Sequence, residues 1–372
     1  MNNSKTLLSR TLTYLESLVG SDTQNPPRRV DSSSPIFCFL KENLPEFDFK
    51  IYDAGDGCIA LLAVRGNPKL LFNFHIDTVP IADGWQSNPF ILKVRDNKAY
   101  GLGACDIKGA SACMLTAANA TNSDLALLFS SDEEFGSSAA IKHFLSFKHN
   151  FESVIVAEPT NGGAVCAHRG IESATITFQG KSGHASSLDA LKFNAIHHAS
   201  KWISNSIDWI AAQAFQFENL KGLPFNAGKI NGGIKANMVA SECEVSFGFR
   251  PLPGTNVEAL INQLKIAAPN DAEVTIKSSF SGPALPATHS LFDEEVRKAK
   301  ALINSLNLPL AEPVNFWTEA SLFSRSGLTS IVYGPGDINQ AHTANEWVEL
   351  KQLEEVTNQY IEIIENTGQK NG

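Results

Sequence analysis

The sequence predicts an α/β protein: a catalytic domain built on a largely parallel sheet, interrupted by a smaller inserted α+β domain. Three observations lead to this prediction. Several short runs are apolar almost throughout, as in strands that are covered on both faces. Helical patterns fall between these runs, which is the order of a parallel α/β sheet. From about Ile171 the order changes to strand, helix, two strands, helix and strand, which is typical of a ferredoxin-like domain.

The catalytic domain is expected over residues 1–170 and 281–372. An amphipathic helix is predicted at 4–19, where leucines recur on one face and Gly20 follows. The strands predicted for this domain are 46–52, 58–64, 69–77, 125–131, 153–158 and 329–334, with helices near 108–120 and 137–147.

The inserted domain is expected over residues 171–280. Its predicted strands are 172–180, 225–230, 242–249 and 272–279, and its predicted helices lie near 189–214 and 256–268.

Composition restricts the classes of function. The 372 residues carry a formal net charge of -9, which argues against binding to nucleic acid or to an anionic membrane. The amphipathic start does not resemble a signal peptide, and no stretch approaches the roughly 18 apolar residues that span a bilayer. The six cysteines are scattered and form no CxxC pair. We therefore expect a reduced, cytoplasmic protein without a disulfide framework.

Residues that commonly bind metal ions lie at the ends of separate hydrophobic runs. They are His75 and Asp77, Asp106, Glu133 and Glu134, Glu158, and His342. Together they offer five ligands, one spare carboxylate that could act as a base and one carboxylate that could support a ligand. A two-metal hydrolase requires such a set. Because ligands bind at the carboxyl ends of strands in open α/β sheets, we expect these residues to form one site.

His75 and Asp77 are two residues apart at a strand end, so their side chains should face the same way. Asp77 is expected to accept the second ring N–H of His75. Taken alone, the pair is also typical of an ordinary strand-end histidine beside a turn aspartate. Glu158 ends an apolar run before Pro159, and a carboxylate there must be paired or bound to a metal.

The glycine-rich segment GLGACDIKG suggests a phosphate loop, and with it a nucleotide-binding enzyme. It lacks both the GKS/T ending of a P-loop and the GxGxxG spacing of a dinucleotide site. We interpret its glycines as room for backbone packed around Asp106, which could bridge two cations through its two oxygens. The alternative is an ordinary glycine turn before a helix.

Asp132, Glu133 and Glu134 follow the apolar run 125–131. Three acids at a strand exit commonly form a solvated turn. Here, one carboxylate could bind a metal while its neighbour transfers a proton, because adjacent side chains diverge in direction.

Six segments carry a resemblance that covers nearly the whole chain: HIDTVP, GLGACDIKG, SSDEEFG, AEPT, GKSGHAS and GPGDINQAHTANEWV. Together they resemble the two-metal zinc deacetylase and exopeptidase family, which includes acetylornithine deacetylases, desuccinylases and glutamate carboxypeptidases. FWTEASLF, HRGIES, NGGIKANM and FGFRPLP resemble the acetylornithine and N-acetylcitrulline deacetylase branch.

The resemblance implies two divalent metal ions, with Zn²⁺ expected and Co²⁺ as an alternative. One would be held by His75, Asp106 and Glu158, and the other by Asp106, Glu134 and His342.

The resemblance also implies roles around the metals. Glu133 would be the general base, Asp77 the partner of His75, and His184 a group that stabilises the oxyanion, often from the partner subunit. Asn237 and Arg250 would bind the substrate α-carboxylate, although the family's Asn-x-x-Pro ends here in Ala240. Glu319 would be a pocket residue.

The implied activity is removal of the acetyl group from N-acetyl-L-ornithine or N-acetyl-L-citrulline, in arginine biosynthesis. A homodimer through the inserted domain is expected. The same scaffold also supports a dipeptidase or carboxypeptidase. A desuccinylase would need a basic contact that we do not find, and a non-catalytic metal-binding protein would have lost some of these residues.

Overall fold

The computed structural model describes residues 2–26, 30–288 and 291–368. The chain forms two compact units. The first unit comprises residues 1–166, 293–311 and 318–372, and the second comprises 167–292 and 312–317.

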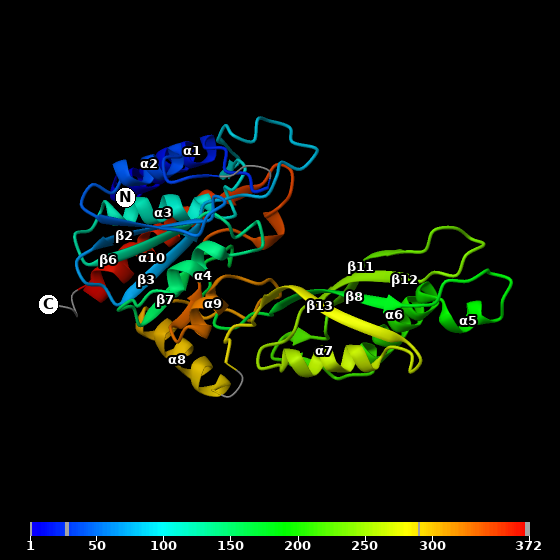
Figure 1. Ribbon diagram of the computed structural model, residues 1–372. Coiled ribbons are helices and arrows are strands. Elements are labelled where there is room, and N and C mark those ends of the chain that lie inside the picture. The colour runs from blue at the N-terminus through cyan, green and yellow to red at the C-terminus, as the bar shows by residue number, and fades with distance from the viewer. Residues whose placement is uncertain (1, 27–29, 289–290, 369–372) are drawn as a thin grey trace. The chain divides into compact units, whose positions relative to one another are not determined.

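The first unit is built on a six-stranded sheet in the order β1-β2-β6-β3-β7-β14 (Figure 1). Its strands are β1 (Asp48–Asp53), β2 (Ile59–Arg65), β3 (Leu70–His75), β6 (Leu125–Ser130), β7 (Ser153–Val156) and β14 (Thr329–Val332). Strands β6, β3, β7 and β14 run parallel, while β1 and β2 are antiparallel at one edge. The predicted fold class, with its largely parallel sheet, is confirmed.

Helices cover both faces of this sheet. The helices of the first unit are α1 (Asn2–Gly20), α2 (Pro35–Glu42), α3 (Lys108–Ala118), α4 (Ala139–Leu145), α8 (Phe292–Ser305), α9 (Ala320–Arg325) and α10 (Leu350–Gly368). Helices α1, α3 and α10 pack together against alternate residues of the strands, such as Phe72 and Phe74. Helix α4 contacts β1 and β2, and helix α9 contacts β7 and β14. Phe144 of α4 packs near Phe323 of α9. Every residue of β3 and β6 is therefore buried, which explains their unbroken apolar character.

A second, three-stranded sheet of the first unit has the order β15-β5-β4. Its strands are β4 (Lys93–Arg95), β5 (Lys98–Tyr100) and β15 (Trp347–Glu349). The short 3-10 helix η1 (Ile338–Gln340) precedes β15. This sheet pairs residues almost 250 positions apart in the sequence, because Trp347 lies opposite Tyr100.

The second unit contains a four-stranded antiparallel sheet in the order β11-β12-β8-β13. Its elements are β8 (Ile171–Gln179), α5 (Asp189–Phe193), α6 (Ala195–Ala211), β11 (Phe225–Gly232), β12 (Glu242–Phe249), α7 (Val257–Ile266) and β13 (Glu273–Gly282). A short hairpin, β9 (Gln216–Phe217) and β10 (Leu220–Lys221), follows α6. The ferredoxin-like order of strands and helices agrees with the prediction.

The helix predicted near 189–214 is divided in two, and this part of the prediction is wrong. Asn194 has an extended backbone (φ -84°, ψ 114°) and ends α5. Its side chain accepts the N–H of Ile196 at 3.0 Å and thus caps α6. Leu188, just before α5, and Leu191, within α5, are exposed and do not contribute to the core.

Two further expectations concern the chain as a whole. All six cysteines are free thiols. Among the described residues, none of the helices is long and apolar enough to cross a membrane.

Candidate metal centre

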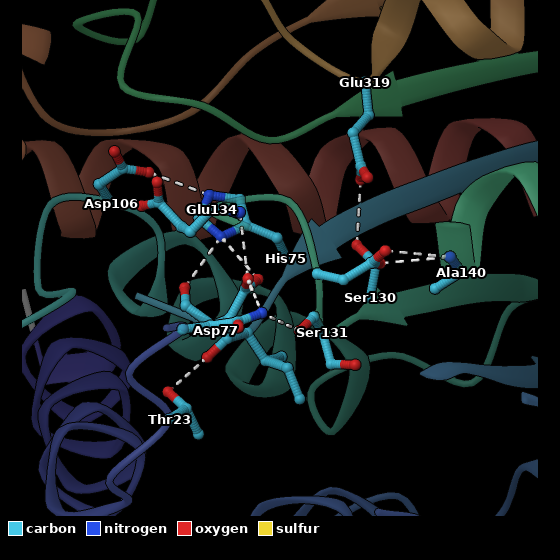
Figure 2. Close-up of polar contacts among 12 residues, drawn as sticks. Thr23, His75, Asp77, Asp106, Ser130, Ser131, Glu134, Ala140 and Glu319 are labelled. Carbon is cyan, nitrogen blue, oxygen red and sulfur yellow. Dashed lines mark hydrogen bonds and ion pairs between the residues drawn. The ribbon is translucent and has the colours of Figure 1, made fainter. Parts of the chain in front are cut away.

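The candidate ligands gather at the carboxyl ends of the parallel strands of the first unit. His75 is the last residue of β3, Glu133 and Glu134 come shortly after β6, and Glu158 follows β7. Because these three strands are parallel neighbours, their ends lie at one edge of the sheet. The loop before α3 brings Asp106 to the same place (Figure 2).

The first group consists of His75, Asp106 and Glu158, whose ligand atoms all lie within 4.8 Å of one another. The Nε2 atom of His75 is 3.0 Å from Oδ1 of Asp106 and 4.0 Å from Oε1 of Glu158. All three residues are buried.

The second group consists of Asp106, Glu134 and His342. The Nε2 atom of His342 is 3.3 Å from Oδ2 of Asp106 and 3.1 Å from Oε1 of Glu134. The two oxygens of Asp106 therefore face different histidines, which is the arrangement required of a carboxylate that bridges two cations. His342 adopts a left-handed backbone conformation (φ 60°), so its placement depends on the surrounding loop.

Burial of several acids close together raises the pKa values of two glutamates of the cluster. Burial and the neighbouring Glu134 raise the pKa of Glu133 well above its usual range. Burial also raises the pKa of Glu158, with Asp106 and Glu134 as further causes. Ionised carboxylates this close together are costly unless cations compensate them. The oxygen and imidazole donors fit divalent cations of the zinc type.

Glu133 lies beside the ligands without belonging to either of the two groups that contain Asp106. It forms a separate group with His75 and Glu134, again within 4.8 Å. A spare carboxylate in this position could exchange a proton with a molecule bound between the ligand groups. Its role as the base stays a prediction.

Asp77 contacts His75 in a way that differs from the expectation. The Nδ1 atom of His75 is 3.0 Å from the main-chain oxygen of Asp77 and 3.6 Å from its Oδ1. The main-chain oxygen is thus the nearer acceptor. Instead, Oδ2 of Asp77 accepts the N–H of Glu134 and an N–H of the Asn25 side chain, each at 3.1 Å. Asp77 therefore also holds the segment that carries Glu134.

Asp132, the first acid of the run at 132–134, has a structural role that sequence reasoning missed. Its carboxylate accepts the Ser137 hydroxyl at 2.9 Å and the main-chain N–H groups of Ala139 and Ala140. These residues begin α4, so Asp132 satisfies helix-terminal donors. The loop that carries Glu133 and Glu134 is thereby fixed at its far end.

Glu319 is buried against the sheet, with only 1% of its surface exposed. Its Oε2 accepts the Ser130 hydroxyl at 3.0 Å, while Oε1 finds no hydrogen-bond partner within the described ranges. Burial and the nearby Asp132 raise the pKa of Glu319 to about 8. Direct contact between Glu319 and a substrate stays a prediction.

Two buried ionisable residues beside the Asp106 loop were also missed. Glu346 accepts main-chain N–H groups of this loop, and Lys108 donates from its ammonium to the Ser21 oxygen at 2.9 Å. Lys108 is only 1% exposed, and burial lowers its pKa to about 8. The available signal was weak: both are single charged residues within otherwise ordinary loop or helix sequence.

The remaining predicted residues lie in the second unit. His184 is exposed and its Nδ1 is 2.7 Å from the Ser186 hydroxyl, and the Asn237 main-chain oxygen accepts the N–H of Ala185 at 3.1 Å. His184 and Asn237 are thus close together in the chain's own fold. Arg250 follows β12 and lines a cavity of about 680 Å³ together with Asn226 and Ser246. Their roles toward a substrate stay predictions.

Comparisons with known proteins point in one direction. The model for peptidase family M20/M25/M40 matches residues 71–366. The chain is 45% identical over 360 residues to the N-acetyl-L-citrulline deacetylase of Xanthomonas campestris pv. campestris, covering 96% of this chain and 97% of that protein. It is 32% identical over 304 residues to the acetylornithine deacetylase of Photorhabdus laumondii, covering 77% and 76% of the two chains.

Solved structures share the fold at lower sequence identity. The aminopeptidase PepT from Bacillus cereus superimposes with a TM-score of 0.73 at 18% identity, covering 97% of this chain and 98% of that chain. The Bacillus subtilis YXEP protein, a dinuclear metal-binding peptidase, superimposes with a TM-score of 0.68 at 12% identity, with 97% and 98% covered.

Replacing Glu319 should change how stability depends on pH. The ordinary glutamate pKa is 4.5, and that of folded Glu319 is about 8. Between these values the unfolded chain releases the proton while the folded protein keeps it, so the free energy of unfolding falls as pH rises. The glutamine of Glu319→Gln does not titrate, so this variant should not show that fall in the free energy of unfolding. We expect the fall in the wild type to be on the order of 1–4 kcal/mol.

The measurement is urea unfolding of chelated wild type and Glu319→Gln at about pH 5 and about pH 9. The difference between the two proteins isolates Glu319, because all other titrating groups are shared. An identical pH dependence for both would show that Glu319 is not a neutral, buried acid.

Proposed function

The chain belongs to peptidase family M20/M25/M40, and from this premise we propose that it hydrolyses N-acetyl amino acids to acetate and the free amino acid. The first candidate substrate is N-acetyl-L-citrulline, because a relative that is 45% identical over 96% of this chain has that activity in its name. N-acetyl-L-ornithine is the second, from the 32% identical acetylornithine deacetylase. Either reaction would serve arginine biosynthesis, in the cytoplasm that the sequence predicts.

One observation supports this proposal above the others: two ligand groups share a single aspartate, and a spare acid lies beside them. Asp106 belongs to both groups, whereas Glu133 belongs to neither. A protein that only stored or bound a metal would need no such extra carboxylate. A hydrolase needs it to move a proton between water and the leaving group.

The donors fit two divalent cations, with Zn²⁺ expected and Co²⁺ as an alternative. His75, Asp106 and Glu158 would hold one ion. Asp106, Glu134 and His342 would hold the other. When bound, such ions polarise a carbonyl and lower the pKa of an attacking water.

The protein's own residues would carry out the proton transfers and hold the substrate. Glu133 would take a proton from the attacking water and later give it to the departing nitrogen, so that acetate and a free amine are released. Burial and the neighbouring Glu134 raise its pKa, which favours a carboxyl group that can hold a proton. Arg250 and Asn237 would bind the α-carboxylate, Arg250 through paired N–H groups. His184 would donate to the oxyanion.

We also propose that the second unit mediates a homodimer. Its surface exposes large apolar side chains that a monomer would leave in water: Leu188 is 86% exposed, Leu191 70% and Ile234 79%. Exposed apolar groups of this size commonly mark association surfaces. A dimer would also allow His184 to act in the partner's site.

Replacing the proposed base should slow turnover strongly and leave the metals in place. We expect Glu133→Gln to lower kcat by about 10²–10⁴-fold, since general acid–base catalysis contributes roughly that much. The matched control is Glu134→Gln, which removes a proposed ligand and should lower metal content. Near-normal turnover of Glu133→Gln with both metals bound would assign the base elsewhere. The measurements are steady-state kinetics and metal analysis of the purified proteins.

Chelation and reloading test the reaction itself. Chelated protein should be inactive, and Zn²⁺ or Co²⁺ should restore deacetylation. We expect kcat/KM to favour N-acetyl-L-citrulline over N-acetyl-L-ornithine by roughly 10-fold or more, since even a small change of a substrate side chain alters kcat/KM by about 10–200-fold. Hydrolysis of dipeptides with no deacetylation of either substrate would replace this proposal with a dipeptidase.

The dimer is tested by sedimentation velocity of the full-length protein at micromolar concentration. Wild type should sediment as a dimer, and Leu188→Glu combined with Ile234→Glu should sediment as a monomer, because charges replace apolar contacts. Ile91→Glu is the control, since Ile91 is 55% exposed on the first unit. Wild type that sediments as a monomer would contradict the proposal.

A further inference from the structure

Glu346 is buried, with 2% of its surface exposed, and its carboxylate binds three main-chain donors of one loop. Its Oε1 accepts the N–H of Cys105 at 2.7 Å and the N–H of Asp106 at 2.9 Å. Its Oε2 accepts the N–H of Gly103 at 2.8 Å. A single side chain therefore binds the main-chain N–H groups of three residues in the loop before α3.

The position of Glu346 is set by the small three-stranded sheet. Trp347, the next residue, begins β15 and lies opposite Tyr100 at the end of β5. The ladder continues past the strands, because Gly101 donates its N–H to the main-chain oxygen of Glu346 at 3.1 Å. The register of this sheet thus places Glu346 directly against the loop that follows β5.

The loop determines where the two oxygens of Asp106 point. Oδ1 is 3.0 Å from Nε2 of His75, and Oδ2 is 3.3 Å from Nε2 of His342. The main-chain N–H of Asp106 is itself bound by Glu346, so a shift of the loop would move both oxygens together. Functional groups of this kind must be held to within a fraction of an ångström.

The short segment 342–346 contacts the Asp106 loop at two points. His342, which faces Asp106, lies four residues before Glu346. Between them, Asn345 accepts the N–H of Gln86 at 2.9 Å through its side chain. The segment 342–346 therefore supplies one candidate ligand and fixes the loop that supplies another.

A carboxylate suits this position better than any neutral side chain. It offers two oxygens and no donor, and its hydrogen bonds from N–H groups are shorter and stronger than those of a neutral acceptor. A glutamine would turn its NH₂ group toward one of the three N–H donors. Burial raises the pKa of Glu346 to about 8, whereas the hydrogen bonds from the N–H groups of Asp106, Gly103 and Cys105 lower this pKa because they favour the ionised carboxylate.

We propose that Glu346 is a positioning residue for the metal centre, because it fixes the main chain of residues 103–106 and thereby directs the two oxygens of Asp106 to separate cations. This inference rests on the proposed function, in that it takes Asp106 as the shared ligand. Glu346 touches neither substrate nor metal in this scheme. Groups that orient ligands typically change metal affinity or activity by about 10–100-fold when replaced.

The test uses full-length chelated protein titrated with Co²⁺, followed by calorimetry and by the visible absorption spectrum. Glu346→Ala loses all three hydrogen bonds, and we expect at least one Co²⁺ to bind about 10–100-fold more weakly, with an altered spectrum. Glu346→Gln keeps one acceptor oxygen and should show a smaller effect. In the Zn²⁺-loaded enzyme, kcat should fall while KM for the N-acetyl amino acid changes little.

Two control variants separate positioning from general stability. Glu349→Gln makes the same chemical change on an exposed residue of β15 and should bind Co²⁺ as wild type does. Thr357→Val removes a buried hydroxyl that donates to the Leu353 oxygen at 2.7 Å in α10. It should lower the melting temperature without changing the Co²⁺ isotherm or spectrum. Glu346→Gln tests the proposal if Glu346→Ala does not fold.

The outcomes distinguish this inference from the proposed function. Wild-type Co²⁺ affinity and spectrum in Glu346→Gln and in folded Glu346→Ala would overturn the positioning role. Weakened Co²⁺ binding in the Glu346 variants supports it even if wild type deacetylates neither N-acetyl amino acid, since that result would remove only the proposed substrate.

Discussion

The site depends on one shared carboxylate. Asp106 places Oδ1 3.0 Å from the His75 ring and Oδ2 3.3 Å from the His342 ring. It is shared by two candidate ligand groups, one with His75 and Glu158 and one with Glu134 and His342. Every other candidate ligand is attached to the end of its own strand or loop. Two adjacent cation sites would require the Asp106 loop to be held in place, and the contacts that hold it are the three-stranded sheet and the hydrogen bonds to the Glu346 carboxylate.

The cost of this arrangement is electrostatic. Several carboxylates are buried within a few ångströms of one another, and burial raises the pKa of Glu133 and of Glu158 well above the usual range. The rest of the first unit explains how so many acids come to be placed together. The apolar core lies between the sheet and its helices, and the candidate ligands converge at the carboxyl ends of the strands. Cations relieve the repulsion, so metal binding and the integrity of the site are coupled.

Local patterns were sufficient for most elements, and they placed the candidate ligands at the ends of apolar runs. Each strand of the parallel sheet is a short apolar run, and His75 and Glu158 stand where those runs end. Patterns failed where a single side chain overrode them. The helix predicted near 189–214 is interrupted because Asn194 caps a new helix. The Asp77 carboxylate as the partner of the His75 ring stays a prediction: Oδ1 lies 3.6 Å from Nδ1, and the main-chain oxygen of Asp77 lies closer, at 3.0 Å.

Local patterns of apolar and charged residues predicted the fold class correctly, because buried strands and amphipathic helices differ in the spacing of their apolar residues. Only the tertiary structure decided which atoms meet. Glu346 lies 240 residues from Asp106 and reaches it through the register of β15 on β5. Glu319 lies 189 residues from Ser130 and is buried against it. Contacts between residues so far apart in the sequence depend on packing and strand register, and neither can be deduced from a local sequence pattern.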